Sequence, residues 1–373
     1  MRKITVLQIL PALESGGVER GTLELAAHLV QEGHRSLVMS SGGRMVPQLL
    51  AEGSTHFTCE IGKKSLLTLR FIVKLRKFLR EQQVDILHVR SRFPAWIAYF
   101  AWRTMPPQTR PILISTVHGK YSVNAYSKIM TKGEHVIVIS NMIQAYVQKN
   151  YQHPIEKMTR IYRGVDTLKY SPAFRADDAW LAAWVQAYPQ TKDQHILTLP
   201  ARVTRWKGQE DFIRILEFVC QHRQDVHALI VGEVKEDKTD FEQQLKQQIA
   251  KAGLENRVTF TGHRADVKEI MSISSVVYSL STEPEAFGRT TLEALSLGVP
   301  VIGYNHGGVA EQLAALLPAG AVEVGNIAEA SILTLNWLEA RPKIVPNTQF
   351  TLHNMLEKTV NVYTNMLAKA GRL

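Results

Sequence analysis

The sequence predicts an α/β protein with two domains, each built on a parallel sheet. The chain has 373 residues, which is more than one hydrophobic core usually supports. Short apolar segments alternate with polar turns and helical segments, most clearly between strands at Ser275–Leu280 and Val299–Tyr304. Between these strands, a turn with Pro284 and Gly288 opens a helix over Thr290–Leu297. In a parallel sheet such turns lie at the carboxyl ends of the strands, where ligands bind.

The formal charge is divided unevenly along the chain. Residues 1–168 hold 23 Lys and Arg against 11 Asp and Glu, whereas the remainder holds 21 against 23. The basic first half therefore suggests an anionic partner. Nucleic acid is disfavoured, because no recognition motif occurs and aromatic residues do not alternate with basic ones as stacking platforms would. An anionic membrane surface or a phosphorylated lipid acceptor fits the same charge.

The sequence favours a protein of the reducing cytosol. Met1–Lys3 leads directly into a strand at Ile4–Leu10, so no signal peptide is predicted. The longest apolar stretch, Phe93–Trp102, is too short to span a bilayer. Cys59 and Cys220 lack metal-ligand spacing, and we expect both to fill the core.

The first strand is followed by a turn that contains two adjacent glycines, Gly16 and Gly17, and then by a helix that continues to about Glu32. Paired glycines at a strand-to-helix turn let the backbone approach a ligand closely. The spacing is not Gly-x-Gly-x-x-Gly, so a dinucleotide site is not indicated. By itself, the turn is either a tight connection or a ligand-facing loop.

The segment Lys63–Arg80 is basic throughout and contains no acidic residue. Its cations are Lys63, Lys64, Arg70, Lys74, Arg76, Lys77 and Arg80. Phe71, Leu75, Phe78 and Leu79 recur at helical spacing, which predicts a basic amphipathic helix. Such a helix either packs its apolar stripe on the sheet or lies on an anionic membrane surface. Both can hold, with the stripe in the core and the cations at the headgroups.

Polar residues follow the next two predicted strands. Arg90 and Arg92 follow the strand Val84–Val89, and two arginines at such a strand end can hold a phosphate or carboxylate by bidentate bonds. Otherwise they are simply solvated. His118 follows the strand Ile112–Val117, and a lone histidine at this position is most often structural.

Further elements complete the predicted order. The strand His135–Ile139 leads into a helix that we expect Asn141 to cap. Strands are predicted at Val226–Val231 and Arg257–Thr261 in the second domain. A helix at about Leu352–Lys369 either crosses back to the first domain or forms an independent cap.

Two cations follow the strand that opens the second domain, His195–Pro200. Arg202 and Lys207 flank the start of a helix near Glu210, where free N–H groups and the helix dipole attract phosphate. The sequence therefore predicts a diphosphate clamp formed by Arg202 and Lys207, with Arg205 outside it. The lysine is not framed by Gly-x4-Gly, so this is not a P-loop.

Two glutamates border the helix start at Thr290–Leu297. Glu285 precedes the helix and Glu293 lies one turn inside it, with seven residues between them. Carboxylates are good acceptors for the hydrogen bonds of vicinal sugar hydroxyls. The alternative is an ordinary helix start in which acidic residues compensate the dipole.

The stretch from Ser281 to Leu313 resembles the Glu-x7-Glu signature of retaining glycosyltransferases with the GT-B fold, the large family that includes sucrose, mannosyl and lipopolysaccharide-core transferases. The resemblance implies that Glu285 contacts the donor sugar and that Glu293 contacts the nucleotide ribose. It also implies that the backbone of Phe287–Thr290 faces the sugar and phosphate. The implied donor-binding residues are Gly16, Gly17, Arg202, Lys207, Gly262, His263, Arg264, Glu285, Ala286, Phe287, Gly288, Arg289, Thr290 and Glu293.

Other segments resemble the same family. Gly-Gly-Val-Glu-Arg at Gly16–Arg20 is similar to the glycine loop beneath the donor phosphate and acceptor, and Gly262–Asp266 to the loop that contacts the nucleobase through its backbone. Arg90–Trp96 resembles an Arg-Ser-Arg-x-Pro-Ala-Trp element of lipopolysaccharide-core mannosyltransferases that act on the Kdo region, which implies an acceptor-binding role for Arg90 and Arg92. The linker Arg163–Thr167 departs from the usual Asn-Gly-Val-Asp by its arginine.

The resemblance covers essentially the whole chain and implies two Rossmann-like domains facing across a cleft. The acceptor-side domain would comprise residues 1–168 with a C-terminal helix at about 352–373, and the nucleotide-sugar domain residues 169–351. The implied catalytic residues are His118, Glu285, Arg202 and Lys207.

The implied reaction is a retaining, metal-independent hexosyl transfer from a nucleoside-diphosphate sugar, with GDP-mannose favoured. The acceptor would be an anionic lipid-linked saccharide of the lipopolysaccharide core, at the cytoplasmic face of the inner membrane. Neither a cofactor nor a metal is expected, and no Asp-x-Asp motif occurs. Alternatives are a UDP-sugar with a phosphoinositol, polyprenyl-linked or soluble acceptor, and a non-catalytic sugar-nucleotide-binding protein.

Overall fold

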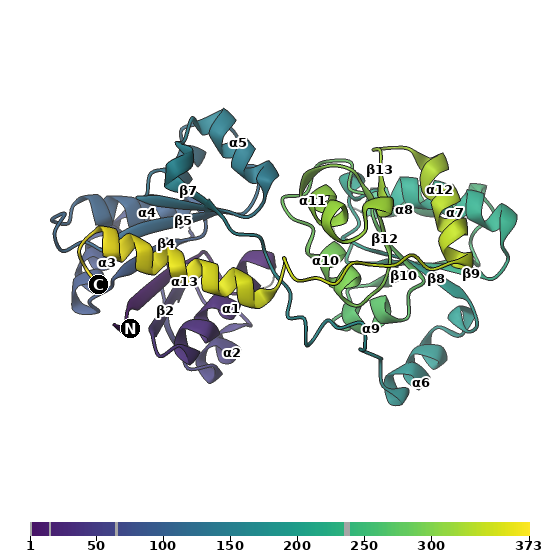
Figure 1. The fold of residues 1–373 in the computed structure, drawn as a ribbon, viewed down its shortest axis with the longest axis horizontal. Coiled ribbons are helices and arrows are strands. Elements are labelled where there is room, and N and C mark those ends of the chain that lie inside the picture. Colours follow the sequence, from purple (N-terminus) through teal and green to yellow (C-terminus); the bar gives the residue numbers. More distant parts are fainter. Residues whose placement is uncertain (1, 15, 64–65, 235–238) are drawn as a thin grey trace. The chain divides into compact units, whose positions relative to one another are not determined.

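The computed structural model describes residues 2–14, 16–63, 66–234 and 239–373, so Met1, Lys64 and Ser65 of the segments discussed above lie outside the described residues. The chain forms two compact units (Figure 1). The first comprises Met1–Arg163 with His353–Leu373, and the second comprises Gly164–Leu352. The boundary therefore falls at Arg163 rather than at residue 168, and the C-terminal helix belongs to the first unit.

The described residues of the first unit form a seven-stranded parallel sheet in the order β3-β2-β1-β4-β5-β6-β7. The strands are β1 (Thr5–Ile9), β2 (Arg35–Ser40), β3 (Thr55–Thr58), β4 (Ile86–Val89), β5 (Ile112–Val117), β6 (His135–Val138) and β7 (Met158–Arg160). The helices are α1 (Gly17–Gln31), α2 (Val46–Ala51), α3 (Arg70–Glu81), α4 (Arg92–Arg103), α5 (Asn141–Tyr151) and α13 (Leu352–Lys369).

The described residues of the second unit form a six-stranded parallel sheet in the order β10-β9-β8-β11-β12-β13. The strands are β8 (His195–Pro200), β9 (Val226–Val231), β10 (Val258–Gly262), β11 (Val276–Ser279), β12 (Val301–Tyr304) and β13 (Ala321–Val322). The helices are α6 (Asp178–Ala187), α7 (Gln209–His222), α8 (Thr239–Lys251), α9 (Val267–Ser272), α10 (Arg289–Ser296), α11 (Gly307–Leu316) and α12 (Ile327–Glu339).

Both sheets are doubly wound, which fixes where a ligand can approach each of them. The strand order reverses between β1 and β4 in the first sheet and between β8 and β11 in the second. A crevice forms outside the carboxyl ends of strands at such a reversal. The residues that follow these four strands, together with the loops after the neighbouring strands, form the candidate site in each unit.

The C-terminal helix α13 packs in the first unit through a buried polar chain. The Tyr363 hydroxyl lies 2.6 Å from His88 Nδ1, and His88 Nε2 lies 2.7 Å from the Thr116 hydroxyl. All three side chains are buried, so α13 is joined to β4 and β5 inside the core. Burial, with Arg90 and Arg163 nearby, holds the pKa of His88 well below its usual value.

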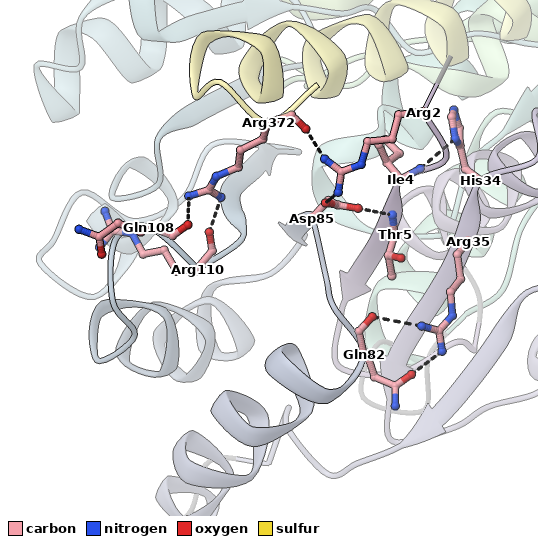
Figure 2. Close-up of polar contacts among 10 residues, drawn as sticks. All are labelled: Arg2, Ile4, Thr5, His34, Arg35, Gln82, Asp85, Gln108, Arg110 and Arg372. Atoms are coloured by element: carbon pink, nitrogen blue, oxygen red, sulfur yellow. Dashed lines mark hydrogen bonds and ion pairs between the residues drawn. The ribbon is translucent and has the colours of Figure 1, made fainter.

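A second set of polar contacts fastens the end of the chain to the first unit (Figure 2). Arg372 donates hydrogen bonds to the carbonyls of Gln108 and Arg110, at 3.3 and 2.5 Å. Arg2 donates to the carbonyl of Arg372 and, at 2.8 Å, to the carboxylate of Asp85. These contacts join residues far apart in the sequence near the amino ends of β1, β4 and β5.

Most predicted strands match the structure within two residues, but β2, β3, β7 and β13 were not predicted. Asn141 does not cap α5: the Ser140 hydroxyl accepts the backbone N–H of Ile143, and Asn141 instead donates to Tyr162. Within the described ranges, no helix is both long enough and apolar enough to cross a bilayer.

Candidate active site

The loop after β8 places Lys207 at the start of α7. A short 3-10 turn, Arg205–Lys207, ends at Gly208, whose φ of 80° lies in the left-handed region that favours glycine. A Cβ at Gly208 would stand 2.0 Å from the carbonyl oxygen of Leu280. The loop after β8 is thus pressed against the end of β11, and only glycine permits this approach.

Lys207 and Glu285 meet between these two adjacent strand ends. The Lys207 Nζ lies 2.6 Å from Glu285 Oε1, and the side chains are 13% and 20% exposed. The Ser281 hydroxyl donates to the same oxygen at 2.6 Å. Two donors on one oxygen fix the orientation of the Glu285 carboxylate.

The loop that carries Glu285 is held from behind by α11. The Gly308 N–H donates to the Glu285 carbonyl at 2.8 Å, and Gln312 donates to the Phe287 carbonyl at 2.5 Å. His306 Nε2 lies 2.7 Å from the carbonyl of Ser281. A Cβ at Gly308 would stand 2.3 Å from the Phe287 Cα, so the two segments pack backbone against backbone.

Glu293 is buried one turn inside α10 and is paired with Arg289. Its Oε1 lies 3.1 Å from Arg289 Nε, and the Glu293 side chain is 7% exposed. Gly288 precedes the helix with a φ of 88°, which lets the backbone turn into α10 without a side chain at that point. Ala286 and Thr290 are half-buried at the same helix start.

The remaining cations predicted near the donor differ in their surroundings. The Arg202 side chain is exposed and has no hydrogen bond or ion pair with a described residue, and its role as a phosphate ligand stays a prediction. Arg205 instead stacks over Phe241 at 4.9 Å. The structure therefore holds Lys207 in place through its contact with Glu285, whereas the side chain of Arg202 is exposed.

The loop after β10 uses its arginine for packing. Arg264 forms a two-point ion pair with Asp266 and lies 5.7 Å over the ring of Trp184. Asp266 also accepts the indole N–H of Trp180 at 2.8 Å. His263 is exposed, and Gly262 has a φ of 67°. The Arg264 side chain thus braces α6, and a contact of this loop with a nucleobase stays a prediction for its backbone.

In the first unit, the glycine turn and His118 are linked through Arg163. Gly16 precedes α1 with a φ of 134°, and Gly17 is the first helical residue. Arg163 Nη2 lies 3.4 Å from the Gly17 carbonyl and 3.0 Å from His118 Nδ1. Burial, with Arg163, Arg90 and His88 nearby, holds the pKa of His118 well below its usual value.

Arg90 and Arg92 do not share a partner among the described residues. Arg90 is 3% exposed and donates to Gln8 at 2.8 Å, and burial lowers the pKa of its guanidinium to about 10. Arg92 begins α4 and stacks over Tyr121 and Tyr126, at 4.8 and 5.6 Å. The structure therefore does not assemble the two arginines into one clamp, and their acceptor role stays a prediction.

Sequence reasoning missed Ser281, His306 and Arg163 as members of these clusters. Ser281 and His306 flank the glutamate loop in sequence, but their polar side chains gave no signal apart from that proximity. Arg163 had a signal, its departure from the usual asparagine, but the partner His118 lies 45 residues away in sequence. Only the fold brings them together.

The comparisons with known proteins agree with this geometry. Residues 15–169 match the family model described as Glycosyltransferase Family 4, and residues 182–348 match Glycosyl transferases group 1. The chain is 26% identical over 273 residues to the lipopolysaccharide core biosynthesis mannosyltransferase LpsB of Rhizobium meliloti (strain 1021), covering 72% of each protein.

Two solved structures extend the similarity over nearly the whole chain. The glycosyltransferase from Rickettsia africae ESF-5 is 30% identical with a TM-score of 0.83, covering 98% of this chain and 99% of that one. Anabaena HepE in complex with UDP and glucose has a TM-score of 0.81 at 22% identity, covering 97% and 99%.

Two doubly wound α/β units, each with a parallel sheet, are the architecture of the GT-B glycosyltransferases. The protein belongs to the GT-B glycosyltransferases.

Proposed function

We propose that the protein is a retaining, metal-independent hexosyltransferase that uses a nucleoside-diphosphate sugar, GDP-mannose in the favoured case. The acceptor we propose is an anionic, membrane-anchored saccharide of the lipopolysaccharide core. The observation that carries the proposal is the Lys207–Glu285 pair, which puts a fixed cation and a fixed carboxylate at the β8/β11 switch point. The similarity to LpsB supports the mannosyl donor and the core acceptor.

The charges at this switch point suit the departure of a nucleoside diphosphate. As the bond between the sugar C1 and the phosphate oxygen breaks, negative charge grows on the phosphate. Lys207, Arg202 and the N–H groups at the start of α7 would stabilise that charge, which removes the need for a metal ion. Glu285 would accept hydrogen bonds from sugar hydroxyls through the lone pairs that Lys207 and Ser281 leave available.

Retention follows if the acceptor attacks on the face from which the diphosphate leaves. A new bond then forms between C1 and the acceptor oxygen, and the acceptor proton passes to the departing phosphate. No protein nucleophile takes part. The pairing of Glu285 with a lysine and a serine supports an orienting role, because both donors lower the nucleophilicity of the carboxylate.

The membrane part of the proposal is supported by α3. Leu75 and Leu79 are each 2% exposed, so the apolar stripe packs on the unit. Lys74, Lys77 and Arg80 are exposed. The helix is therefore a core element with a cationic outer face, and such a face supports the proposal that it binds anionic headgroups. Peripheral attachment at the cytoplasmic face of the inner membrane is the location that we propose.

A UDP-sugar is the second candidate donor, since Anabaena HepE was solved with UDP and glucose. A backbone-based nucleobase loop does not by itself select the base, and the acceptor would then be a phosphoinositol, polyprenyl-linked or soluble sugar. A non-catalytic sugar-nucleotide-binding protein is a third reading.

A thermal-shift titration with GDP, UDP, ADP and their sugar conjugates, in excess chelator, tests the donor site. A ligand that binds only the folded protein raises its stability by mass action. Stabilisation by GDP and GDP-mannose supports the mannosyl proposal, whereas stabilisation by UDP alone moves it to a UDP-sugar. Lack of response to all of them contradicts the donor site, and a response only after metal addition contradicts metal independence.

Glu285→Gln then separates an enzyme from a binding protein. The substitution keeps the shape of the side chain but removes its charge, so release of nucleoside diphosphate from the donor should fall by about 100-fold or more, while the thermal shift remains. Unchanged turnover would remove Glu285 from the reaction. If neither protein releases nucleoside diphosphate, with or without acceptor, the binding-protein reading is favoured.

A further inference from the structure

His118 and Arg163 form a hydrogen bond that has only one consistent proton arrangement. Arg163 Nη2 lies 3.0 Å from His118 Nδ1. A guanidinium carries N–H donors and offers no acceptor, so the imidazole nitrogen must accept. An imidazole that accepts at Nδ1 is neutral and carries its proton at Nε2.

The groups around His118 oppose its second protonation. Arg163 follows β7, while His88 and Arg90 lie on and just after β4. All three disfavour the cation, in addition to burial. The Tyr121 hydroxyl faces the His118 backbone N–H at 3.4 Å, and burial raises the pKa of that phenol, so it stays neutral. Glu24 of α1 acts on Arg90 and does not contribute to the pKa of His118.

The proton-bearing atom of His118 is the one without a partner. Nε2 is shielded from solvent and has no hydrogen bond with a described residue. A buried N–H donor without an acceptor costs free energy and is rare in folded proteins. Such a donor is matched by a ligand atom with a lone pair, such as a hydroxyl or ether oxygen.

The position of Arg163 depends on a glycine in the middle of α1. A Cβ at Gly21 would stand 2.5 Å from Arg163 Nη1. Glycine inside a helix is normally unfavourable, and the closeness of the Arg163 guanidinium explains why a residue without a side chain stands at this position. The guanidinium also contacts the Gly17 carbonyl at 3.4 Å and the Met355 sulfur at 3.7 Å. It is therefore held by α1 and α13 while it reaches His118.

We propose that Arg163 is a positioning residue that holds His118 as the neutral tautomer protonated at Nε2, so that His118 donates a hydrogen bond to a substrate oxygen and does not act as a base at that nitrogen. The substrate part rests on the proposed function. The tautomer and its cause concern only the first unit and do not depend on catalysis.

Nitrogen-15 NMR of histidine-labelled protein tests the tautomer directly. Long-range proton–nitrogen correlations distinguish a ring protonated at Nε2 from one protonated at Nδ1, and His118→Gln identifies the signals. We expect the Nε2–H pattern to persist as the pH falls from 8 through the ordinary histidine pKa of about 6.5. An Nδ1–H pattern, or titration near pH 6.5, would overturn the proposal.

Two variants test the role of Arg163. Arg163→Met should leave His118 as a mixture of tautomers with a pKa shifted toward 6.5. Gly21→Ala should produce the same change by displacing the guanidinium, without altering either partner, and this keeps the test valid if Arg163→Met fails to fold. Gly17→Ala is the matched control for the NMR signals, because nothing lies within 4 Å of its Cβ position. Unchanged His118 signals in folded Gly21→Ala or Arg163→Met protein would refute the role of Arg163.

Turnover separates this inference from the proposed function. With an active donor and acceptor, Arg163→Met should lower kcat by about 10-fold or more and move the acid limb of the pH profile toward 6.5, with the donor KM nearly unchanged. If the NMR result holds but nucleotide sugar is not turned over, the proposed function fails and the tautomer assignment stands. If turnover is normal in Arg163→Met while the tautomer changes, the proposed hydrogen bond from His118 to a substrate oxygen is refuted as a contribution to catalysis.

Discussion

Lys207 and Glu285 should be coupled in stability by about 2 kcal/mol. At 2.6 Å, the Coulomb attraction in an effective dielectric of about 20 is about 6 kcal/mol, most of which offsets the desolvation of the two ions. Their exposures of 13% and 20% lie between those of a surface pair, worth about 0.5 kcal/mol, and a buried pair, whose disruption costs about 3 to 5 kcal/mol. Ser281 retains its bond to Glu285 when the lysine is removed, which lowers the cost of the single substitution.

A double-mutant cycle measures this coupling. Urea unfolding of the wild type, Lys207→Met, Glu285→Gln and the double variant gives four free energies of unfolding, and the double variant should be more stable than the sum of the single effects predicts. The control cycle uses Lys246 and Glu242 on α8, a pair of similar length, 2.7 Å, with the lysine 59% exposed. The control coupling should be about 0.5 kcal/mol. Equal couplings in the two cycles would refute the view that the switch point holds a partly desolvated ion pair.

The same proteins separate stability from ligand binding. The double variant regains stability because neither partner is left as an uncompensated charge, but it still lacks the lysine cation. Nucleoside diphosphate should therefore bind about 10-fold or more weakly to it than to the wild type. Wild-type affinity in the stable double variant would remove Lys207 from the diphosphate site while leaving the ion pair intact.

Three further predictions concern α3, His227 and the serine beside Glu285. Replacing Lys74, Lys77 and Arg80 together with glutamine should weaken binding to anionic vesicles by about 100-fold, at about 1 kcal/mol per charge. An equal change of charge on exposed lysines of the second unit should have little effect. Equal weakening by both sets of substitutions would contradict the proposal that α3 is the membrane-binding surface. Burial and Arg257 lower the pKa of His227 to about 4, so the unfolded chain binds the extra proton first and stability is lost as pH falls from 6.5 to 4. This loss, about 2 kcal/mol after allowance for solvent screening, should be smaller in His227→Gln when urea unfolding is compared at pH 7 and pH 4.5. An equal loss in the variant would exclude the histidine as its cause. Ser281→Ala removes one of two donors to Glu285 and should lower kcat by about 10-fold with unchanged nucleotide affinity; a shift in affinity alone would assign the serine to binding.

The strands that could be predicted from the sequence are those recognisable from their own residues alone. Strands β5, β8 and β9 are buried apolar runs, and each lies within the predicted bounds. By contrast, β7 and β13 have only three and two residues, and their pairing with the rest of the sheet defines them as strands. A run this short is set by its neighbours in space, which a sequence pattern does not contain.

The candidate site could likewise be predicted only in part. The strand ends that carry Lys207 and Glu285 could be predicted, because each follows a recognisable strand. Their direct contact could not, since it depends on β8 and β11 being neighbours across 78 residues of sequence. Arg90 illustrates a second limit: the sequence shows only that an arginine follows a strand, whereas in the structure Gln8 on the adjacent strand accepts its N–H in the interior.

The two units differ in how their charges are balanced. In the second unit, Lys207 is matched by Glu285 and Arg289 by Glu293, and both pairs are partly or largely buried. In the first unit, Lys77 of α3 pairs only with the exposed Glu81, at 3.6 Å, and Lys74 and Arg80 have no ion pair with a described residue. This agrees with the excess of basic residues before residue 169. Salt screens exposed charges strongly and buried pairs weakly. Ionic strength should therefore act on the encounter with the proposed anionic, lipid-linked acceptor far more than on the geometry of Glu285 at the proposed donor site.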